Sequence, residues 1–553
     1  MKLTRLKIGT IGLMTLVLTG CQAPETLQSN TDNKGLMIHN QNVHIIENTR
    51  LSTVDISKVA SFRMLTSSTE GLFRLGKNGH VALGLAKSYK ISHAGKQYVF
   101  KLRPNARWSN GEPINAQDFV YSWRRTVTPS THSANANMFD GIKNAAAIRE
   151  NRLPANQLGV KATAKKTLKI TLDHPIYYFT RLLAYPLFAP QHQGMVTTYG
   201  KQYGRSAAHQ LYSGPFKLVK WHHNANSRIL EPNPYYWDRR HVYLHSLTFT
   251  CSKSPQRNLA HFRAGKVAEI QLIGDQIPKN KDDTDYMVRP FALMRFISYN
   301  FNTADKTIRK LIHIRAARLA ITHAIDRNDL IDHGIKTASL APRGFAPAGL
   351  SNNNRTNADF ADQNKYPEFV QDNRPKARQE WHQAQKILGQ KDVTIDLSTP
   401  NDPTSLAAAK NLQKQLQDTL PGLTVKLVPY QSDNTANVGL SGQYQLLLTG
   451  WGADYPDPLA FFQIMTTNSQ YNFGHWHNKH YDKLVSEVTE YRTDNPETRW
   501  QQMVRAEDLL MKDQPVVPLY QQANSYLTNP RLNGVVYNVS GVPTDYKSAY
   551  LVK

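Results

Sequence analysis

The sequence of 553 residues carries 67 Lys and Arg against 42 Asp and Glu, a formal net charge of +25. Apolar residues make up 40% of the chain and aromatic residues 10%, which excludes the disordered class and predicts a folded protein. A chain of this length exceeds one hydrophobic core, so we expect two or three lobes. The basic residues are dispersed, without a run of five Lys or Arg, which favours a generally basic surface over a nucleic-acid site.

The N-terminus has the pattern of a secretory signal. Lys2, Arg5 and Lys7 precede a short apolar stretch over residues 8–18. About eleven apolar residues are too few to cross a bilayer as a helix. Removal of the three basic residues with this segment lowers the formal charge from +25 to +22.

Residues 18–21 read Leu-Thr-Gly-Cys and resemble a bacterial lipobox, in which the cysteine is diacylated and becomes the first mature residue. We therefore predict a lipoprotein signal peptide over residues 1–20, followed by lipidated Cys21 and a polar tether over residues 21–36. The lipid would hold the chain at the cell membrane, on its extracellular face.

The remaining potential metal and redox residues form no persuasive site. With Cys21 lipidated, Cys251 has no disulfide partner, and we expect it to be a small buried apolar residue. His222 and His223 are adjacent, and His475 and His477 lie near His480. No nearby Cys, Asp or Glu completes a persuasive ligand set with them. There is no Gly-x-Ser-x-Gly elbow and no His-Glu-x-x-His motif. The sequence therefore predicts no metal, no cofactor and no enzyme activity.

Turn signals and alternating apolar residues indicate strands in the first half of the chain. Residues 37–80 and 209–292 are strand-rich, and a hairpin is expected where 89–92 pairs with 98–102 across a glycine-containing turn. The residues 115–118 that follow, Asn-Ala-Gln-Asp, have N-cap chemistry and predict a helix beginning near Phe119.

Strands and helices alternate in the second half, which predicts a sheet covered by helices. The expected strands are 295–302, 393–398, 424–429 and 444–449, and the expected helices are 308–325, 404–419, 478–491 and 496–512. A strand beginning at Val516 and the tail are expected to return to the first lobe, which makes both lobes discontinuous around a hinged cleft. The predicted division is lobe I over 37–80, 209–292 and 520–553, an extra subdomain over 81–208, and lobe II over 293–519.

Residues 451–458 read Trp-Gly-Ala-Asp-Tyr-Pro-Asp-Pro and directly follow an apolar strand. Strand ends on α/β scaffolds are common ligand sites. A carboxylate beside an indole suits a cationic group such as a peptide α-amine, although Asp454 could instead be a helix cap or a ligand-free loop carboxylate. Trp451 is expected either in the core or in the pocket wall. Asp457, before Pro458, is expected to cap a helix beginning at Leu459.

Several segments together carry a resemblance that covers nearly the whole mature chain. They are Leu-Ala-Lys-Ser-Tyr at 85–89, Phe-Lys-Leu-Arg-Pro-Asn-Ala-Arg-Trp-Ser-Asn-Gly-Glu-Pro at 100–113, Asp-Phe-Val-Tyr-Ser-Trp at 118–123, Ser-Gly-Pro-Phe-Lys-Leu at 213–218, Asn-Pro-Tyr-Tyr-Trp at 233–237, 316–327 and 450–458. In order and spacing they resemble the extracellular solute-binding proteins of family 5, which include oligopeptide- and dipeptide-binding components of ABC importers. The resemblance implies an α/β fold of the periplasmic-binding-protein-like type II (cluster C) class. It also implies two ligand-enclosing lobes plus an extra subdomain, and a monomer.

The resemblance to the oligopeptide-binding branch also implies site residues. Asp454 corresponds to the aspartate that pairs with the peptide α-ammonium. Main-chain groups that contact the peptide backbone correspond to two sets, Gly450, Trp451 and Gly452 after the strand, and Val59, Ala60 and Ser61 in an early loop. No segment matches the residues that contact the peptide C-terminus, so ligand length stays open.

These features predict a lipid-anchored receptor that captures extracellular oligopeptides for an ABC importer. Its partners would be two permease subunits and two cytoplasmic ATPases. Two alternatives are a signalling receptor for one peptide pheromone, with the same fold, and a polyanion-binding surface protein suggested by the charge. No nucleic-acid partner is expected.

Overall fold

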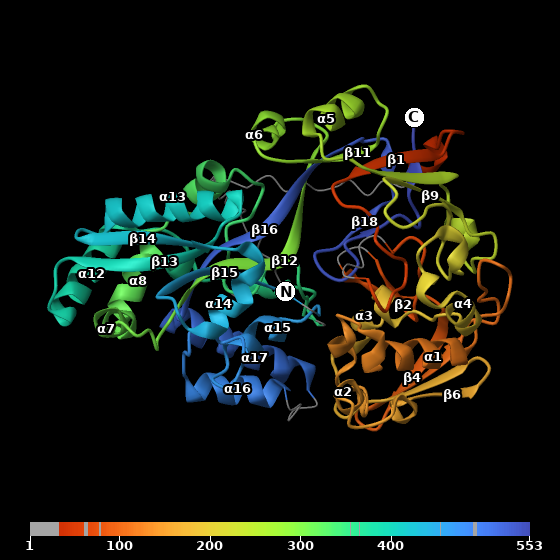
Figure 1. Cartoon of the computed structure of the whole chain (residues 1–553), viewed down its shortest axis with the longest axis horizontal. Coiled ribbons are helices and arrows are strands. Elements are labelled where there is room, and N and C mark those ends of the chain that lie inside the picture. The colour runs from red at the N-terminus through yellow and green to blue at the C-terminus, as the bar shows by residue number, and fades with distance from the viewer. Residues whose placement is uncertain are drawn as a thin grey trace, which may run out of the picture.

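The computed structural model describes residues 33–59, 65–76, 79–353, 355–363, 365–453, 455–489 and 495–553. Two bodies lie side by side in Figure 1, and two long strands, β12 (Tyr286–Tyr299) and β16 (Val516–Thr528), run between them. The 14 residues of β12 reach over roughly 45 Å, which is enough to cross from one body to the other. The fold is a mixed α/β fold of the type II periplasmic-binding class.

One ten-stranded sheet passes through both bodies, with the order β14-β13-β15-β12-β16-β11-β1-β10-β9-β8. Its other strands are β1 (Asn42–Glu47), β8 (Phe216–Lys220), β9 (Ser227–Pro232), β10 (Ser246–Cys251), β11 (Glu269–Leu272), β13 (Val393–Pro400), β14 (Leu423–Tyr430) and β15 (Leu446–Gly452). Strand β12 pairs antiparallel with both β15 and β16. The expected strands at 393–398, 424–429 and 444–449 are confirmed as β13, β14 and β15.

A separate four-stranded sheet has the order β4-β5-β7-β6. Its strands are β4 (Ala86–Ser92), β5 (Gln97–Leu102), β6 (Val160–Ala164) and β7 (Thr167–Thr171). The predicted hairpin is confirmed, with Ser92 opposite Gln97 in the antiparallel pair. The helix expected after it is α1 (Ala116–Val127), and the Asp118 carboxylate accepts a 2.8 Å hydrogen bond from the Asn115 N–H at its start.

The second body is rich in helices, and one expected helix is wrong. Residues 308–325 form two helices, α7 (Lys306–His313) and α8 (Arg315–His323), because Ile314 between them has an extended main chain with ψ 109°. Both helices bury their apolar faces in the same core. The spacing of apolar residues predicts which face of a helix is buried. It does not predict a one-residue interruption of the helix.

The remaining helices cover the sheets or join them. In chain order they are α2 (Ala145–Arg149), α3 (Phe179–Leu182), α4 (Gln193–Tyr199), α5 (Pro255–Arg263), α6 (Gln276–Asn280), α9 (Arg327–Asp329), α10 (Phe360–Gln363), α11 (Pro367–Val370), α12 (Arg374–Leu388), α13 (Pro403–Thr419), α14 (Thr435–Ser441), α15 (Leu459–Phe462), α16 (Lys479–Thr489) and α17 (Pro496–Asp513). The short strands are β2 (Phe73–Leu75), β3 (Val81–Leu83), β17 (Leu532–Asn533), β18 (Val536–Tyr537), β19 (Thr544–Asp545) and β20 (Tyr550–Leu551).

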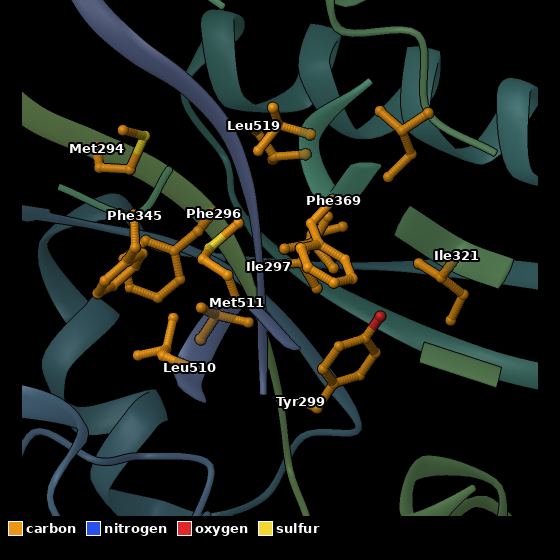
Figure 2. Packing of buried hydrophobic residues seen from close by; sticks show 14 of the residues in the cluster. Met294, Phe296, Ile297, Tyr299, Ile321, Phe345, Phe369, Leu510, Met511 and Leu519 are labelled. Atoms are coloured by element: carbon orange, nitrogen blue, oxygen red, sulfur yellow. The ribbon is translucent and has the colours of Figure 1, made fainter. Parts of the chain in front are cut away.

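The largest hydrophobic core forms around the crossing strands. Figure 2 shows side chains of one buried cluster, which includes Met294, Phe296 and Ile297 of β12 and Leu510 and Met511 of α17. All five side chains are buried. Because this packing holds β12 on the helical body, the strand end beside β15 has a fixed position.

Candidate functional site

Strand β15 has an open edge in its second half. It pairs with β12 along its full length, from Leu446 opposite Tyr299 to Gly452 opposite Leu293. On the other side, β13 pairs only with Leu446 and Leu447. Among the described residues, no strand therefore pairs with that side of residues 448–452. An open strand edge offers N–H and C=O groups that can pair with an extended chain.

Trp451 lies near the end of this edge and packs against the core, which is one of its two expected positions. Its half-buried ring packs against the large core and lies 4.8 Å from the ring of Tyr471. Its indole Nε1 is buried and has no hydrogen-bond partner among the described residues. A buried donor without a partner costs free energy, so a ligand acceptor at this position would be stabilised.

The two glycines of β15 differ in the space available for a side chain at each position. A Cβ on Gly450 would lie 2.8 Å from Arg295 Cδ and 3.0 Å from the Met294 carbonyl, so a side chain there would displace Arg295. A Cβ on Gly452 would meet no atom closer than 3.8 Å. Packing therefore requires glycine only at Gly450.

Asp457 has the structural role expected from the sequence. Its carboxylate accepts a 3.0 Å hydrogen bond from the Leu459 N–H at the start of α15. It also accepts two hydrogen bonds from the Arg499 guanidinium, at 2.9 and 2.8 Å, and this ion pair is buried. Asp454 lies outside the described residues, so its contact with a ligand stays a prediction.

A cavity of about 540 Å³ includes Pro456 and Asp457, which follow β15 in the chain, in its lining. It is lined by His80, Val81, Tyr177, Tyr178, Thr180, Arg181, Ser351, Asn352, Asn353, Arg355, Pro456, Asp457, Asn495, Pro496, Glu497, Arg499 and Trp500. A second cavity of about 240 Å³ shares Arg181, Ser351, Asn352 and Pro456 with it. The two cavities thus form one hollow between α3 and the body that carries α17. Gly450, Trp451 and Gly452 are not in its lining, which the chain reaches at Pro456, four residues after Gly452.

Contacts between described residues join the two walls of the hollow. The Tyr178 ring stacks on the Tyr455 ring with a centroid distance of 4.3 Å and an interplanar angle of 7°. The Arg499 guanidinium lies 5.1 Å from the centre of the Tyr177 ring. Arg181 Nη1 donates a 3.1 Å hydrogen bond to Ser351 Oγ. These contacts are few and polar or aromatic, which suits walls that separate and close.

Arg181 is the cation that faces both cavities, and sequence reasoning missed it. Burial lowers the pKa of its guanidinium, and the nearby Asp457 carboxylate offsets part of that effect. Within the described part of the chain, no carboxylate forms an ion pair with it; its guanidinium donates to the Ser351 hydroxyl. A desolvated guanidinium with so few partners favours an anionic ligand group. A lone arginine in the apolar run 176–183 is the signal that could have identified it.

The early loop is anchored inside its own body. The Val59 N–H donates to the Asp55 carbonyl at 3.1 Å, and its carbonyl accepts a 3.0 Å bond from Asn135 Nδ2. Asp55 is in turn held by the Arg125 guanidinium at 2.7 and 2.6 Å. Val59 has no unused N–H, although its carbonyl keeps a second lone pair. Ala60 and Ser61 lie outside the described residues, so the ligand role of these three positions stays a prediction.

Other features assign no second chemistry to the described part of the chain. It contains no group of three or more His, Cys, Asp and Glu placed to hold a metal ion. Cys251 is half-buried instead of buried as expected, because it ends β10, where the cover of the sheet stops. None of the described helices is long and apolar enough to cross a bilayer.

The two bodies, the crossing strands and the hollow between them define a solute-binding protein. Residues 80–473 match the profile of the bacterial extracellular solute-binding proteins, family 5. The chain is 32% identical over 513 residues to a dipeptide-binding protein of Lactococcus lactis subsp. cremoris, covering 91% of this chain and 92% of that protein. It therefore belongs to the family 5 extracellular solute-binding proteins.

Two solved structures have the same fold. Listeria monocytogenes OppA bound to peptide is 29% identical, covers 93% of this chain and 100% of its own, and has a TM-score of 0.71. The pheromone receptor PrgZ, whose structure was described with its mode of peptide binding, is 31% identical with a TM-score of 0.72. It also covers 93% of this chain and 100% of its own length.

Proposed function

We propose that this protein is a receptor that binds peptides in extended form along the open edge of β15 and closes over them. The observation that carries the proposal is the side of residues 448–452 that pairs with no described strand, together with a hollow of about 540 Å³ whose lining begins four residues after that edge, at Pro456. Main-chain pairing satisfies the peptide's own N–H and C=O groups whatever its sequence. Relatives described as a dipeptide-binding protein and as OppA bound to peptide support the same ligand class.

In this proposal the charges at the two ends of the site fix the direction of the peptide. Asp454 pairs with the α-ammonium, and the main-chain groups of Gly450, Trp451 and Gly452 pair with the peptide backbone. Arg181, which donates to the Ser351 hydroxyl, binds a peptide carboxylate, either the C-terminus or an acidic side chain. Val59, Ala60 and Ser61 are the proposed main-chain partners on the opposite wall.

The proposed biological role is delivery of the peptide to an ABC permease and its ATPases. Cys21 carries the lipid that holds the receptor on the extracellular face of the membrane. Lobe I comprises 37–80, 209–292 and 520–553, the extra subdomain 81–208, and lobe II 293–519. The likeness to the pheromone receptor PrgZ favours a second candidate, a receptor dedicated to one signalling peptide.

Calorimetry of residues 22–553, which include every described residue, tests this proposal. The ligands are mixed four- to nine-residue peptides, each free and N-acetylated. We expect binding that acetylation weakens by about thirtyfold or more, and Asp454→Asn should reproduce that loss because it removes one member of an enclosed ion pair. The control Asp418→Asn changes an exposed carboxylate of α13 and should leave affinity unchanged.

Each other outcome has a defined meaning. Binding that survives acetylation would keep the receptor but remove Asp454 from its assigned role. Tight binding of a single sequence, with no response to the mixture, would select the pheromone receptor. Absence of binding to every peptide would contradict the proposal.

A further inference from the structure

The four-stranded sheet has one covered face and one open face. Helix α1 packs against β6 and β7 on the covered face. Side chains at every second position of β5 and β7, including Phe100 and Ile170, are buried there. The intervening positions point the other way, away from α1, and apart from buried Thr167 they are exposed or half-buried. Figure 1 places β4 and β6 at the lower edge of the molecule, at the opposite end from α5 and α6.

Strand register brings lysines together on this open face. Lys90 is opposite Val99, Val99 is opposite Lys169, and Lys169 is opposite Lys161, so one row crosses all four strands. Lys101 lies two residues from Val99 on the same face. We call Lys90, Lys101, Lys161 and Lys169 the lysine face. Directly opposite residues have Cβ atoms about 5 Å apart, so four ammonium groups share a small patch.

Acidic residues do not balance these charges. The segments 86–102 and 160–171, which form the sheet and its turns, contain eight lysines and no Asp or Glu. In the described structure, none of the four lysines forms an ion pair, and Lys101 Nζ donates to Thr167 Oγ1 at 3.0 Å. The nearest acidic residue along the chain is Asp173, exposed beyond the end of β7.

The fold does not require this arrangement. Like charges directly opposite each other in an antiparallel pair destabilise the sheet, and Lys161 and Lys169 are such a pair. A lysine on an exposed strand is ordinarily a solvated residue, but a row of unpaired lysines across a whole sheet costs stability without any compensation inside the chain. An anionic partner would supply this compensation.

We propose that the lysine face docks on an anionic lipid membrane. The face is a broad sheet surface of four strands, which fits a membrane surface better than a linear polymer. It also presents no aromatic ring for base stacking, because Tyr98 and Phe100 point to the covered side. Lysines near an anionic leaflet each contribute to binding, and several together can orient a protein that is held loosely by other means.

Vesicle binding by residues 22–553 tests this proposal without contribution from a lipid anchor. The probes are vesicles of phosphatidylglycerol and phosphatidylcholine in equal parts, and vesicles of phosphatidylcholine alone. We expect binding only to the anionic vesicles, weakened by added salt. Each lysine removed should cost about fivefold in affinity, so the variant with all four changed to Gln should bind at least about a hundredfold more weakly.

A matched control has the same change in net charge on the other body. Lys386, Lys391, Lys410 and Lys426 are exposed and belong to no ion pair in the described structure. Changing these four to Gln should alter vesicle binding by less than about twofold. Changing the lysine face to Arg should preserve binding, since the charge is retained.

Two further measurements keep the proposal testable if the fourfold variant misfolds. The double variant Lys161→Gln with Lys169→Gln removes a repulsive pair, so it should fold at least as well and lose about twentyfold in affinity. Equal losses in the lysine-face and control variants, or no loss in either, would overturn the proposal. Binding to soluble polyphosphate that depends on the lysine face, without vesicle binding, would also overturn it and identify a polymer partner.

Discussion

Arg289 and Arg181 are both withdrawn from solvent, but their partners differ. Arg289 of β12 donates to both carboxylate oxygens of Glu269 and to Thr528 Oγ1, and it lies between the rings of Tyr526 and Tyr537 at 4.1 and 3.7 Å. Burial opposes its charge, yet the nearby Glu269 carboxylate raises its pKa. Arg181 has the Ser351 hydroxyl, and burial lowers its pKa.

The different partners of the two arginines indicate different roles, one in stability and one in ligand binding. A buried cation in an ion pair holds β12 to β11, which itself pairs with β16. A desolvated cation with few partners beside a hollow keeps donor capacity for a ligand. The same residue type therefore contributes to stability in one place and is available for recognition in the other.

The largest effect is expected for Arg289→Met. Removal of the guanidinium leaves the Glu269 carboxylate buried without its partner, which should lower the free energy of unfolding by about 3–5 kcal/mol. Urea unfolding followed by circular dichroism measures this loss. A loss below about 1 kcal/mol would mean that the cluster does not hold the crossing strands.

A smaller effect is expected for Gln521→Leu, at the irregular part of the crossing strands. The register between β12 and β16 shifts between Pro290 and Met294. There, the Gln521 side chain donates to the carbonyls of Phe291 and Ala348 at 3.0 and 2.9 Å and accepts from the Ala348 N–H at 2.9 Å. Leucine would leave these groups without partners and lower the free energy of unfolding by roughly 2–3 kcal/mol.

The control for that variant is Gln390→Leu at an exposed position. It should change the free energy of unfolding by less than about 0.5 kcal/mol. If both glutamine variants behave alike, the Gln521 hydrogen bonds do not stabilise the junction.

Arg181→Met sharpens the comparison with the identical change at Arg289. The free energy of unfolding should change by less than about 1 kcal/mol, because Arg181 makes few polar contacts inside the protein. Affinity for peptides with a free carboxylate should fall about tenfold, while the matching peptide amides should bind equally to both proteins. A destabilisation as large as that of Arg289→Met would remove the distinction between the two arginines.

The smallest effect concerns acidification. Burial lowers the pKa of His44 in β1 and of His174, which follows β7. Below the ordinary value of 6.5 the unfolded chain therefore binds more protons than the folded one, so stability falls as the pH falls from about 7.5 to about 5.5. Urea midpoints at the two pH values should show the drop, and His44→Gln should reduce it. A midpoint that rises on acidification would contradict this assignment.

Local patterns in the sequence predict much of the fold and little of the site. The hairpin of β4 and β5 and the strands β13 to β15 follow from alternation and turn residues that are close in the chain. The open edge of β15 exists because β13 pairs only with the first two residues of β15. No local sequence pattern predicts where this pairing ends. The Asp457–Arg499 ion pair joins residues 42 apart, and Arg181 reaches the hollow only after the two bodies are placed.

The central claim is that a peptide adds to the unpaired side of β15. Hydrogen–deuterium exchange of residues 449–453, with and without saturating peptide, tests it most directly. The account predicts slower exchange of these amides on peptide addition, while the four-stranded sheet is unchanged. Peptide binding proven by calorimetry but without any protection of this segment would contradict the account.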